Sequence, residues 1–498
     1  MNSNHFTRRD ALKGAGALAM AVSALEIAGP LAWTPQRASA ATCLPDIQFD
    51  IDAFLAAPPQ TSATGVVFQL PPVHTVFATA KLQRTPTRRD QRTLARALDR
   101  LEASYPFGAR HIITIVSYGL PYFSRLTGGL TGGLVAEHLP RLLSDTSRYV
   151  LEEAVAGPTD VSPANPGIIK VPYNVPVALE SNDMLFTIRG DNAQFISDVL
   201  AWLAGSNVLR GCPVESPSFD GLLSFTSSRY QFVQMGLPKA VAVQNNLAFA
   251  NYMQHDSPMW LGFADQQTSG NGPPAICTFA GNDSARLTTA TAGDYFDNGS
   301  IQHLSHVILG MLQWFDMSTA TTPPKPDGFF IQRVQYMFQA PNMVPGNTDP
   351  LTDGGGPSFL NNTNNGPGYA AQEAAGIVTN IDPATGLPER RMGHLSCLQR
   401  SSRAADGTPI HIRMDGPGFD NMDIPDGSNQ AKLQFTIFVP SADFFRTMRI
   451  NQVSSDLQQE FGVQDIKIGL ERLLTATRRQ NFLCPPRRHR AFPLVEFT

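Results

Sequence analysis

One dense polar stretch of the sequence, TPIHIRMDGPGFDNMDIPDG, occupies residues 408–427. Its imidazole, His411, is of the type that binds a transition metal when neutral. Its guanidinium, Arg413, is of the type that stabilises negative charge during a reaction. The simplest structural interpretation of the same residues is an extended surface segment in which His411 lies beside Arg413.

The same run also places four carboxylates among glycines, and oxygen-rich bent loops of this kind can hold calcium. The spacing does not match an EF-hand, and Asp next to Gly is also typical of ordinary turns. Calcium binding therefore stays open as an alternative, with four candidate ligands: Asp415, Asp420, Asp423 and Asp426.

Several common enzyme classes lack support in the sequence, which contains no GxSxG, P-loop, dinucleotide-binding glycine pattern or HExxH. The five cysteines include no close pair, so we expect neither a zinc knuckle nor a CxxC redox site, and we predict no essential disulfide. His303 and His306, on an expected strand, would face opposite sides of it and are expected to be core or interface histidines.

Hydrophobic periodicity predicts the elements that must position these side chains. The first half of the chain reads as strand, helix, strand, strand and helix, and Asp191 is the expected N-cap of the second helix. The predicted strands lie at residues 73–82, 111–117 and 184–189, and the predicted first helix at residues 87–103.

The second half repeats part of this order. The FTI at residues 186–188, followed by Ala193 and Phe195, recurs as FTI at residues 435–437, followed by Ala442 and Phe444. Both copies predict a strand, a tight turn and a helix, with Ser441 as the N-cap of the second copy. Together these patterns predict an α+β fold of two similar halves, each burying a sheet face against helices.

We therefore expect an N-terminal half at residues 41–215 and a C-terminal half at residues 216–498. The segment at about 318–390 is rich in Gly, Asn and Pro, and only residues 329–338 within it have the pattern of a strand. Such a composition predicts a long, loop-rich surface insertion in the C-terminal half.

Residues 1–40 have the pattern of a twin-arginine signal peptide, with Arg8 and Arg9, a small apolar run and Ala-Ser-Ala at its end. Glu26 and Pro30 interrupt the apolar run before it reaches the roughly 20 residues that a membrane span needs. We expect the twin-arginine translocase to export the folded chain to the periplasm or the cell exterior. The net charge of −4 and the absence of a basic run argue against nucleic-acid binding.

Four segments in the same order resemble the dye-decolorising (DyP-type) peroxidases. SYGLPYFSRL at residues 117–126 resembles their GFGPxxFxR, and SNDMLFTIRGDNAQF at 181–195 their GGDLLxxIxADDxxx strand. SIQHLSHVILGMLQWF at 300–315 resembles their GGSYxxxRxIxxxxxxW, and IHIR at 410–413 their AHIRxxNP. The resemblance implies two ferredoxin-like halves of the dimeric α/β-barrel type, with antiparallel sheets and haem b in the C-terminal half.

The resemblance also implies roles for individual residues. The family's His in AHIRxxNP is the proximal ligand of the haem iron, which implies that role for His411, supported by a carboxylate on its other ring nitrogen. GFADQ at residues 262–266 resembles the family's GxxDG, so Asp265 is the expected distal acid–base, although Gln266 replaces the last Gly. The family's distal Arg follows the His, but residues 414–431 contain no Arg, so Arg403 and Arg413 are the candidates.

The function implied by the resemblance is that of an exported haem peroxidase that oxidises a small organic donor and self-associates. Two alternatives stay open on the sequence. One is a noncatalytic protein of the same fold that binds a small ligand or a structural metal. The other is an exported binding protein stabilised by calcium.

Overall fold

The computed structural model describes residues 44–50, 60–61, 67–68, 70–170, 173–253, 255–261, 271–281, 287–315, 410–453 and 473–498. The expected signal peptide and the expected insertion at 318–390 lie outside these residues. Within the described part of the chain, none of the helices has the length and apolar character that a membrane crossing requires.

The first half folds as the expected strand, helix, strand, strand and helix, completed by a further strand that lies beyond the expected boundary at residue 215. Its elements are β3 (His74–Leu82), α3 (Arg88–Ser104), β4 (Ile113–Gly119), β6 (Met184–Gly190), α6 (Ala193–Leu203) and β9 (Leu223–Phe232). The strands pair antiparallel in the order β4-β6-β3-β9. This βαββαβ order, with the first strand between the third and the fourth, is the ferredoxin-like arrangement.

The second half repeats the arrangement. Its elements are β10 (Ser300–Leu309), β11 (Ile412–Arg413), β12 (Gly416–Asp420), β13 (Gln430–Val439), α13 (Ala442–Val453) and β14 (Leu474–Cys484). β13 pairs antiparallel with β10, β11 and β12, and β10 pairs antiparallel with β14. The two FTI copies lie in β6 and β13, the equivalent strands of the two halves, so the predicted doubled α+β fold is confirmed.

Shorter elements connect these parts. They are β1 (Gln60–Thr61), β2 (Val67–Phe68), α4 (Leu120–Arg125), α5 (Gly133–His138), β5 (Ala178–Leu179), β7 (Val208–Leu209), β8 (Cys212–Pro213), α7 (Leu237–Gln244), α8 (Met311–Trp314) and four 3-10 turns, η2 (Ala250–Tyr252), η3 (Pro274–Cys277), η6 (Arg487–His489) and η7 (Val495–Phe497).

The helix caps show how local sequence sets the element bounds. Ser441 Oγ accepts a hydrogen bond from Phe444 N at 3.2 Å, which confirms Ser441 as the expected cap of α13. The prediction for α6 was wrong by one residue: Asn192 is the N-cap, and its Oδ1 accepts from Gln194 N at 2.9 Å. The Asp191 carboxylate instead accepts from Val73 N at 3.0 Å and ties β3 to the end of β6.

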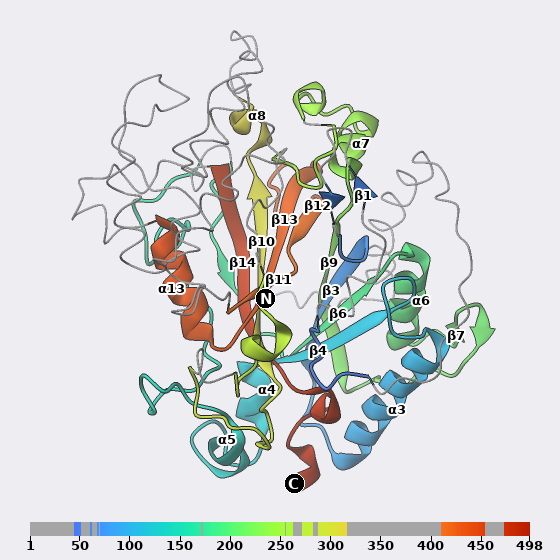
Figure 1. Ribbon diagram of the computed structural model, residues 1–498, viewed down its shortest axis with the longest axis vertical. Helices are drawn as coiled ribbons and strands as arrows, with labels where there is room; N and C mark the ends of the chain where they lie inside the picture. The colour runs from blue at the N-terminus through green and yellow to red at the C-terminus, as the bar shows by residue number, and fades with distance from the viewer. Residues whose placement is uncertain are drawn as a thin grey trace.

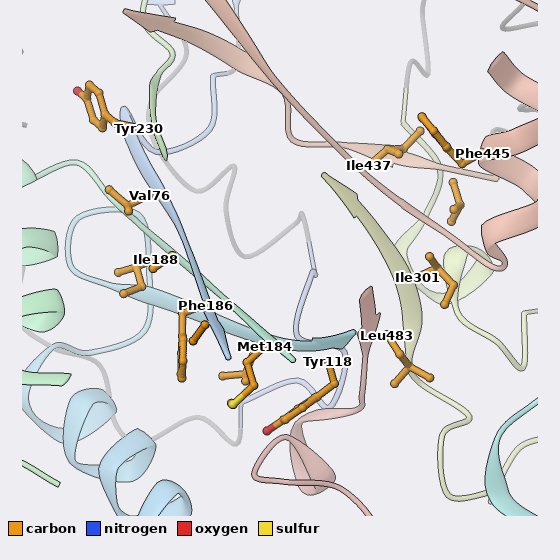
Figure 2. Close-up of a cluster of buried hydrophobic side chains, with 14 of the residues drawn as sticks. Val76, Tyr118, Met184, Phe186, Ile188, Tyr230, Ile301, Ile437, Phe445 and Leu483 are labelled. Carbon is orange, nitrogen blue, oxygen red and sulfur yellow. The ribbon is translucent and has the colours of Figure 1, made fainter. Parts of the chain in front are cut away.

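The two halves share one ten-stranded sheet with an outer and an inner face. The outer face is covered by α3 and α6 in the first half and by α13 in the second (Figure 1). Figure 2 shows the apolar side chains of this face, with Val76, Phe186 and Ile188 in one half and Ile301 and Ile437 in the other. Alternate residues point to the inner face.

The sheet curls until its outer edges, β9 and β12, meet. Gln231 Nε2 donates to Met414 O at 2.8 Å across this seam. Two glycines allow the close approach: a Cβ added at Gly416 would lie 2.5 Å from Val233 Cγ2, and one at Gly418 would lie 2.9 Å from Tyr230 O. Gly416 and Gly418, which belong to the alternative calcium loop, therefore allow the sheet to close into a barrel.

Replacing Gly416 with Ala is expected to overpack this seam and to lower the free energy of unfolding by about 1–3 kcal/mol. Urea unfolding measures the change. Gly167→Ala is the matched control, because a Cβ there meets nothing within 4 Å, and it should stay within about 0.5 kcal/mol of wild type. Equal effects of the two substitutions would contradict the closed seam.

Candidate functional site

His411 lies directly before β11, and its side chain is completely buried, at 0% exposure. The interpretation of this run as a surface segment is therefore wrong for His411. β11 pairs with β13 through Ile412 opposite Phe438 and Arg413 opposite Ile437. Because Ile437 belongs to the outer-face core, the Arg413 side chain lies on the outer face. His411 precedes the paired residues Ile412 and Arg413, so the pairing of β11 fixes the face of Arg413 and not that of His411.

Two hydrogen bonds tie this segment to residues that come shortly after the GFADQ motif. Gly272 N donates to His411 O at 2.8 Å, and Arg413 N donates to Asn271 Oδ1 at 2.8 Å. Asp265 and Arg403 lie outside the described residues, and the described chain resumes at Asn271. The fold thus brings the end of the motif-bearing segment to the His411 strand, although the two are far apart in the sequence.

The carboxylates of the alternative calcium loop are not gathered into one site. Asp423 pairs with Arg478 at 2.6 Å, Asp426 Oδ1 accepts from Ser428 N at 2.9 Å, and Asp420 Oδ1 lies 3.7 Å from Lys432 Nζ. In the described ranges no three His, Cys, Asp or Glu side chains form a group that could hold a metal ion. Arginine and lysine partners and turn hydrogen bonds, rather than an ion, account for Asp420, Asp423 and Asp426.

A second buried polar group, which we call the outer-face cluster, lies over β10 and β14 and consists of Asp160, His303, Ser305, Arg449, Arg479 and Asn481. Arg479 binds the Asp160 carboxylate through two hydrogen bonds, Nε to Oδ2 at 2.7 Å and Nη2 to Oδ1 at 3.0 Å. Its Nη1 donates to Ser305 Oγ at 2.8 Å. Arg449 of α13 lies 3.7 Å from the same carboxylate, so the cluster joins strand, loop and helix.

The charges of this cluster hold Asp160 ionised. Burial opposes ionisation, but the charges of Arg479 and Arg449 and the hydrogen bonds from Arg479 and Gly157 N outweigh it, so the pKa of Asp160 lies below its ordinary value. An aspartate held in this way has both oxygens engaged. Its function is to neutralise two buried guanidinium groups.

His303 closes the outer face above β10. Its Nδ1 lies 2.7 Å from Asn481 Oδ1, its Nε2 lies 2.6 Å from Ser305 Oγ, and its ring stacks on Phe445 with centroids 3.3 Å apart. Figure 2 shows the Phe445 ring beside Ile437, between α13 and the sheet. Protein side chains therefore take up the face over β10 and the neighbouring part of β13.

His306 lies on the opposite, inner face, as expected from its spacing to His303, and both are core histidines with no exposed surface. His306 Nδ1 lies 3.1 Å from Gln434 Oε1. Burial lowers the pKa of His306 to about 4 and that of the neighbouring Lys432 to about 8.

The chemistry of these side chains shows whether they suit haem. An imidazole is a common ligand of haem iron, and a cation suits the haem carboxylates. His411 and Arg413 belong to this donor set; burial lowers the pKa of the Arg413 guanidinium, and the charge of Asp415 opposes that shift. The His303–Phe445 stack occupies the face over β10, so the residues that would hold haem are those of the β11 segment.

The outer-face cluster was missed in the sequence analysis. One signal was available: Gly157-Pro158-Thr159-Asp160 matches the first four positions of GxxDG as well as GFAD at residues 262–265 does. Arg479 and Ser305 gave no signal, because their contacts with Asp160 and with each other join distant parts of the chain.

Comparisons with known proteins give a family and a set of similar structures. A family model described as "Family of unknown function (DUF7405)" matches residues 146–486, more than half of the chain. None of the curated proteins matches the sequence.

Three solved structures illustrate the structural likeness. A DyP-type peroxidase from Cellulomonas bogoriensis has 12% identity and a TM-score of 0.45, with 84% of this chain and 90% of that chain covered. A DypB variant from Rhodococcus jostii RHA1 in complex with haem has 12% identity and a TM-score of 0.44, with 85% and 96% covered. A dye-decolorizing protein from V. cholerae has 11% identity and a TM-score of 0.40, with 84% and 95% covered. The strand order of the chain itself gives the doubled ferredoxin-like fold.

Proposed function

The chain belongs to the DUF7405 family, and we propose that it is an exported haem protein that reduces peroxide while oxidising a small organic donor. One observation carries the proposal: the buried strand with His411 and Arg413 is hydrogen-bonded to Asn271 and Gly272, which follow the motif containing Asp265. The described residues that follow the Asp265 motif therefore lie against the segment that carries His411 and Arg413.

In this proposal each group has a separate task. Bound haem supplies the redox chemistry of peroxide reduction. His411 would hold the iron through a ring nitrogen, and Arg413, two residues later, would pair with a haem carboxylate. Asp265 accepts the proton of the incoming peroxide.

A noncatalytic haem carrier is the second candidate. It is favoured by the sequence that follows Arg413, because residues 414–431 contain no arginine. Loss of a charge-stabilising donor typically lowers turnover about a hundredfold or more. Added peroxide separates the two candidates: a peroxidase changes its visible spectrum and oxidises a dye, whereas a carrier does neither.

The visible spectrum of protein produced with added haem precursor tests haem binding. We expect a Soret band in the wild type and its loss in His411→Ala, because no other residue is proposed to bind the iron. His255→Ala is the matched control, since that side chain is 82% exposed, and its band should equal that of wild type. A band of full strength in a folded His411→Ala variant would exclude His411 as the ligand.

Export is proposed to follow the twin-arginine route. Cys212, Cys277 and Cys484 are free thiols, and a fold without disulfides between them can form before export. Replacing Arg8 and Arg9 together by Lys should retain the protein in the cytoplasm, as measured by cell fractionation and immunoblotting. Secretion of the double variant at the wild-type level would point to another route.

A further inference from the structure

The junction between the two halves of the sheet is short. β4 and β14 pair only through Phe482 opposite Gly119 and Leu483 opposite Tyr118. Within a half, neighbouring long strands pair over many more residues, as β3 and β6 do along seven. The hydrogen bonds between β4 and β14 alone therefore join the halves weakly.

Gln48, near the start of the described chain, extends this junction. Its Oε1 accepts from Val116 N of β4 at 3.1 Å, and its Nε2 donates to Val116 O at 3.2 Å. The same Nε2 donates to Pro485 O, directly after β14, at 2.7 Å. A side-chain amide offers a donor and an acceptor like a peptide group, so the completely buried Gln48 replaces a missing strand residue.

The next residue, Phe49, packs on both halves. Its ring stacks on Phe438 of β13 with centroids 4.7 Å apart and an interplanar angle of 12°. The buried cluster around it contains residues from the first half and from the His411 strand: Ile113, Ile115, Ile412 and Met414. Because Ile412 directly follows His411, Phe49 supports the segment that carries the proposed iron ligand.

Asp46 anchors the segment at its other end. Its backbone oxygen accepts from Arg487 N at 2.6 Å, and its carboxylate accepts from Arg488 N and from Asn298 Nδ2, both at 3.0 Å. Arg487 Nε donates to Pro45 O at 2.8 Å. These bonds join the segment to the chain after β14 and to the turn before β10.

We infer that residues 45–49 form an N-terminal strap that locks the two halves together and positions the His411 strand through Phe49. Gln48 supplies the lock at the β4–β14 junction, and Phe49 fills the space beneath Ile412. The locking role stands on the fold alone, whereas the consequence for haem rests on the proposed function.

Hydrogen exchange of the full-length mature protein tests the strap. The reporters are amides with hydrogen bonds around β11, namely Gly272 N to His411 O and Met414 N to Thr436 O. Phe49→Ala should lower the protection of these amides by about tenfold or more relative to amides of α3, because β11 loses the packing of the Phe49 ring in the buried cluster with Ile412 and Met414. Phe49→Leu, which keeps an apolar side chain there, should restore most of the protection.

Phe123→Ala is the control for a purely structural effect. Phe123 is completely buried in the first-half core and lies outside the Phe49 cluster. Phe123→Ala should lower the hydrogen-exchange protection of amides in the first half at least as much as that of the β11 amides. If Phe49→Ala instead lowers protection uniformly, or leaves the β11 amides unchanged, the positioning role is wrong.

The Soret band then separates this inference from the proposed function. If the wild type binds haem, Phe49→Ala should broaden or shift the band, and Phe49→Leu should return it to the wild-type position. If the wild type binds no haem, the proposed function fails, and the exchange experiment still decides the strap. Gln48→Ala should lower the unfolding midpoint, and an unchanged midpoint would contradict the lock.

Discussion

Acidification from pH 7 to pH 4.5 is expected to destabilise the protein strongly, through histidines that the fold buries without charge. Burial lowers the pKa of His74 and of His306 from 6.5 to about 4. The pKa of His303 lies well below its ordinary value, because burial, and then the charge of Arg479, disfavours the imidazolium.

The direction of the change in stability with pH depends on whether the folded or the unfolded chain protonates its histidines more readily. Below pH 6.5 the histidines of the unfolded chain bind protons, whereas the same histidines stay neutral in the folded chain. The free energy of unfolding therefore falls until the pH reaches the pKa of these histidines in the folded state. A fall of the pKa from 6.5 to about 4 corresponds to about 3 kcal/mol for His74 and for His306, reached in full once the pH drops below the folded pKa. Urea unfolding at a series of pH values measures this slope.

His306→Gln should reduce the dependence of the unfolding free energy on pH by the contribution of one histidine, whatever its effect on stability at pH 7. His255→Gln is the control, since the exposed His255 side chain should leave the slope unchanged. A wild-type free energy of unfolding that stays level between pH 7 and pH 4.5 would contradict the burial of these rings.

Asp160→Asn is expected to cost about 3–5 kcal/mol of unfolding free energy, because it leaves two guanidinium groups in the outer-face cluster without their carboxylate. The carboxylate receives two hydrogen bonds from Arg479 and lies 3.7 Å from Arg449. Urea unfolding at pH 7 measures the loss.

Asp145→Asn is the matched control. Asp145 lies in an exposed turn, where its carboxylate accepts from Ser147 N at 3.0 Å, and its replacement should cost less than about 1 kcal/mol. A double-mutant cycle with Arg479→Gln should show strong coupling to Asp160. Additive effects of the two substitutions would mean that the pair does not act as a unit.

The doubled fold could be predicted from the sequence because both halves use the same local pattern at equivalent positions. FTI followed by Ala and Phe predicts a strand, a turn and a helix in β6–α6 and in β13–α13, and alternation and caps are local signals. The cap of α6 was misplaced by one residue, because Asp191 and Asn192 are both good caps and only the contact of Asp191 with Val73 distinguishes them.

The site was only partly predictable, because its contacts join distant parts of the chain. Gly416 and Gly418 looked like bends of a calcium loop, whereas they allow β12 to approach β9. The outer-face position of Arg413 depends on the pairing of β11 with β13, which no local pattern in the sequence predicts. The Gln48 and Phe49 contacts had no sequence signal.

An iron anomalous-difference map from crystals of protein produced with haem precursor tests the central claim most directly. The account predicts one iron peak at ligand distance from a ring nitrogen of His411, with Arg413 beside a haem carboxylate and Phe445 still stacked on His303. An iron peak beside any other side chain, or a porphyrin lying between His303 and Phe445, would contradict it.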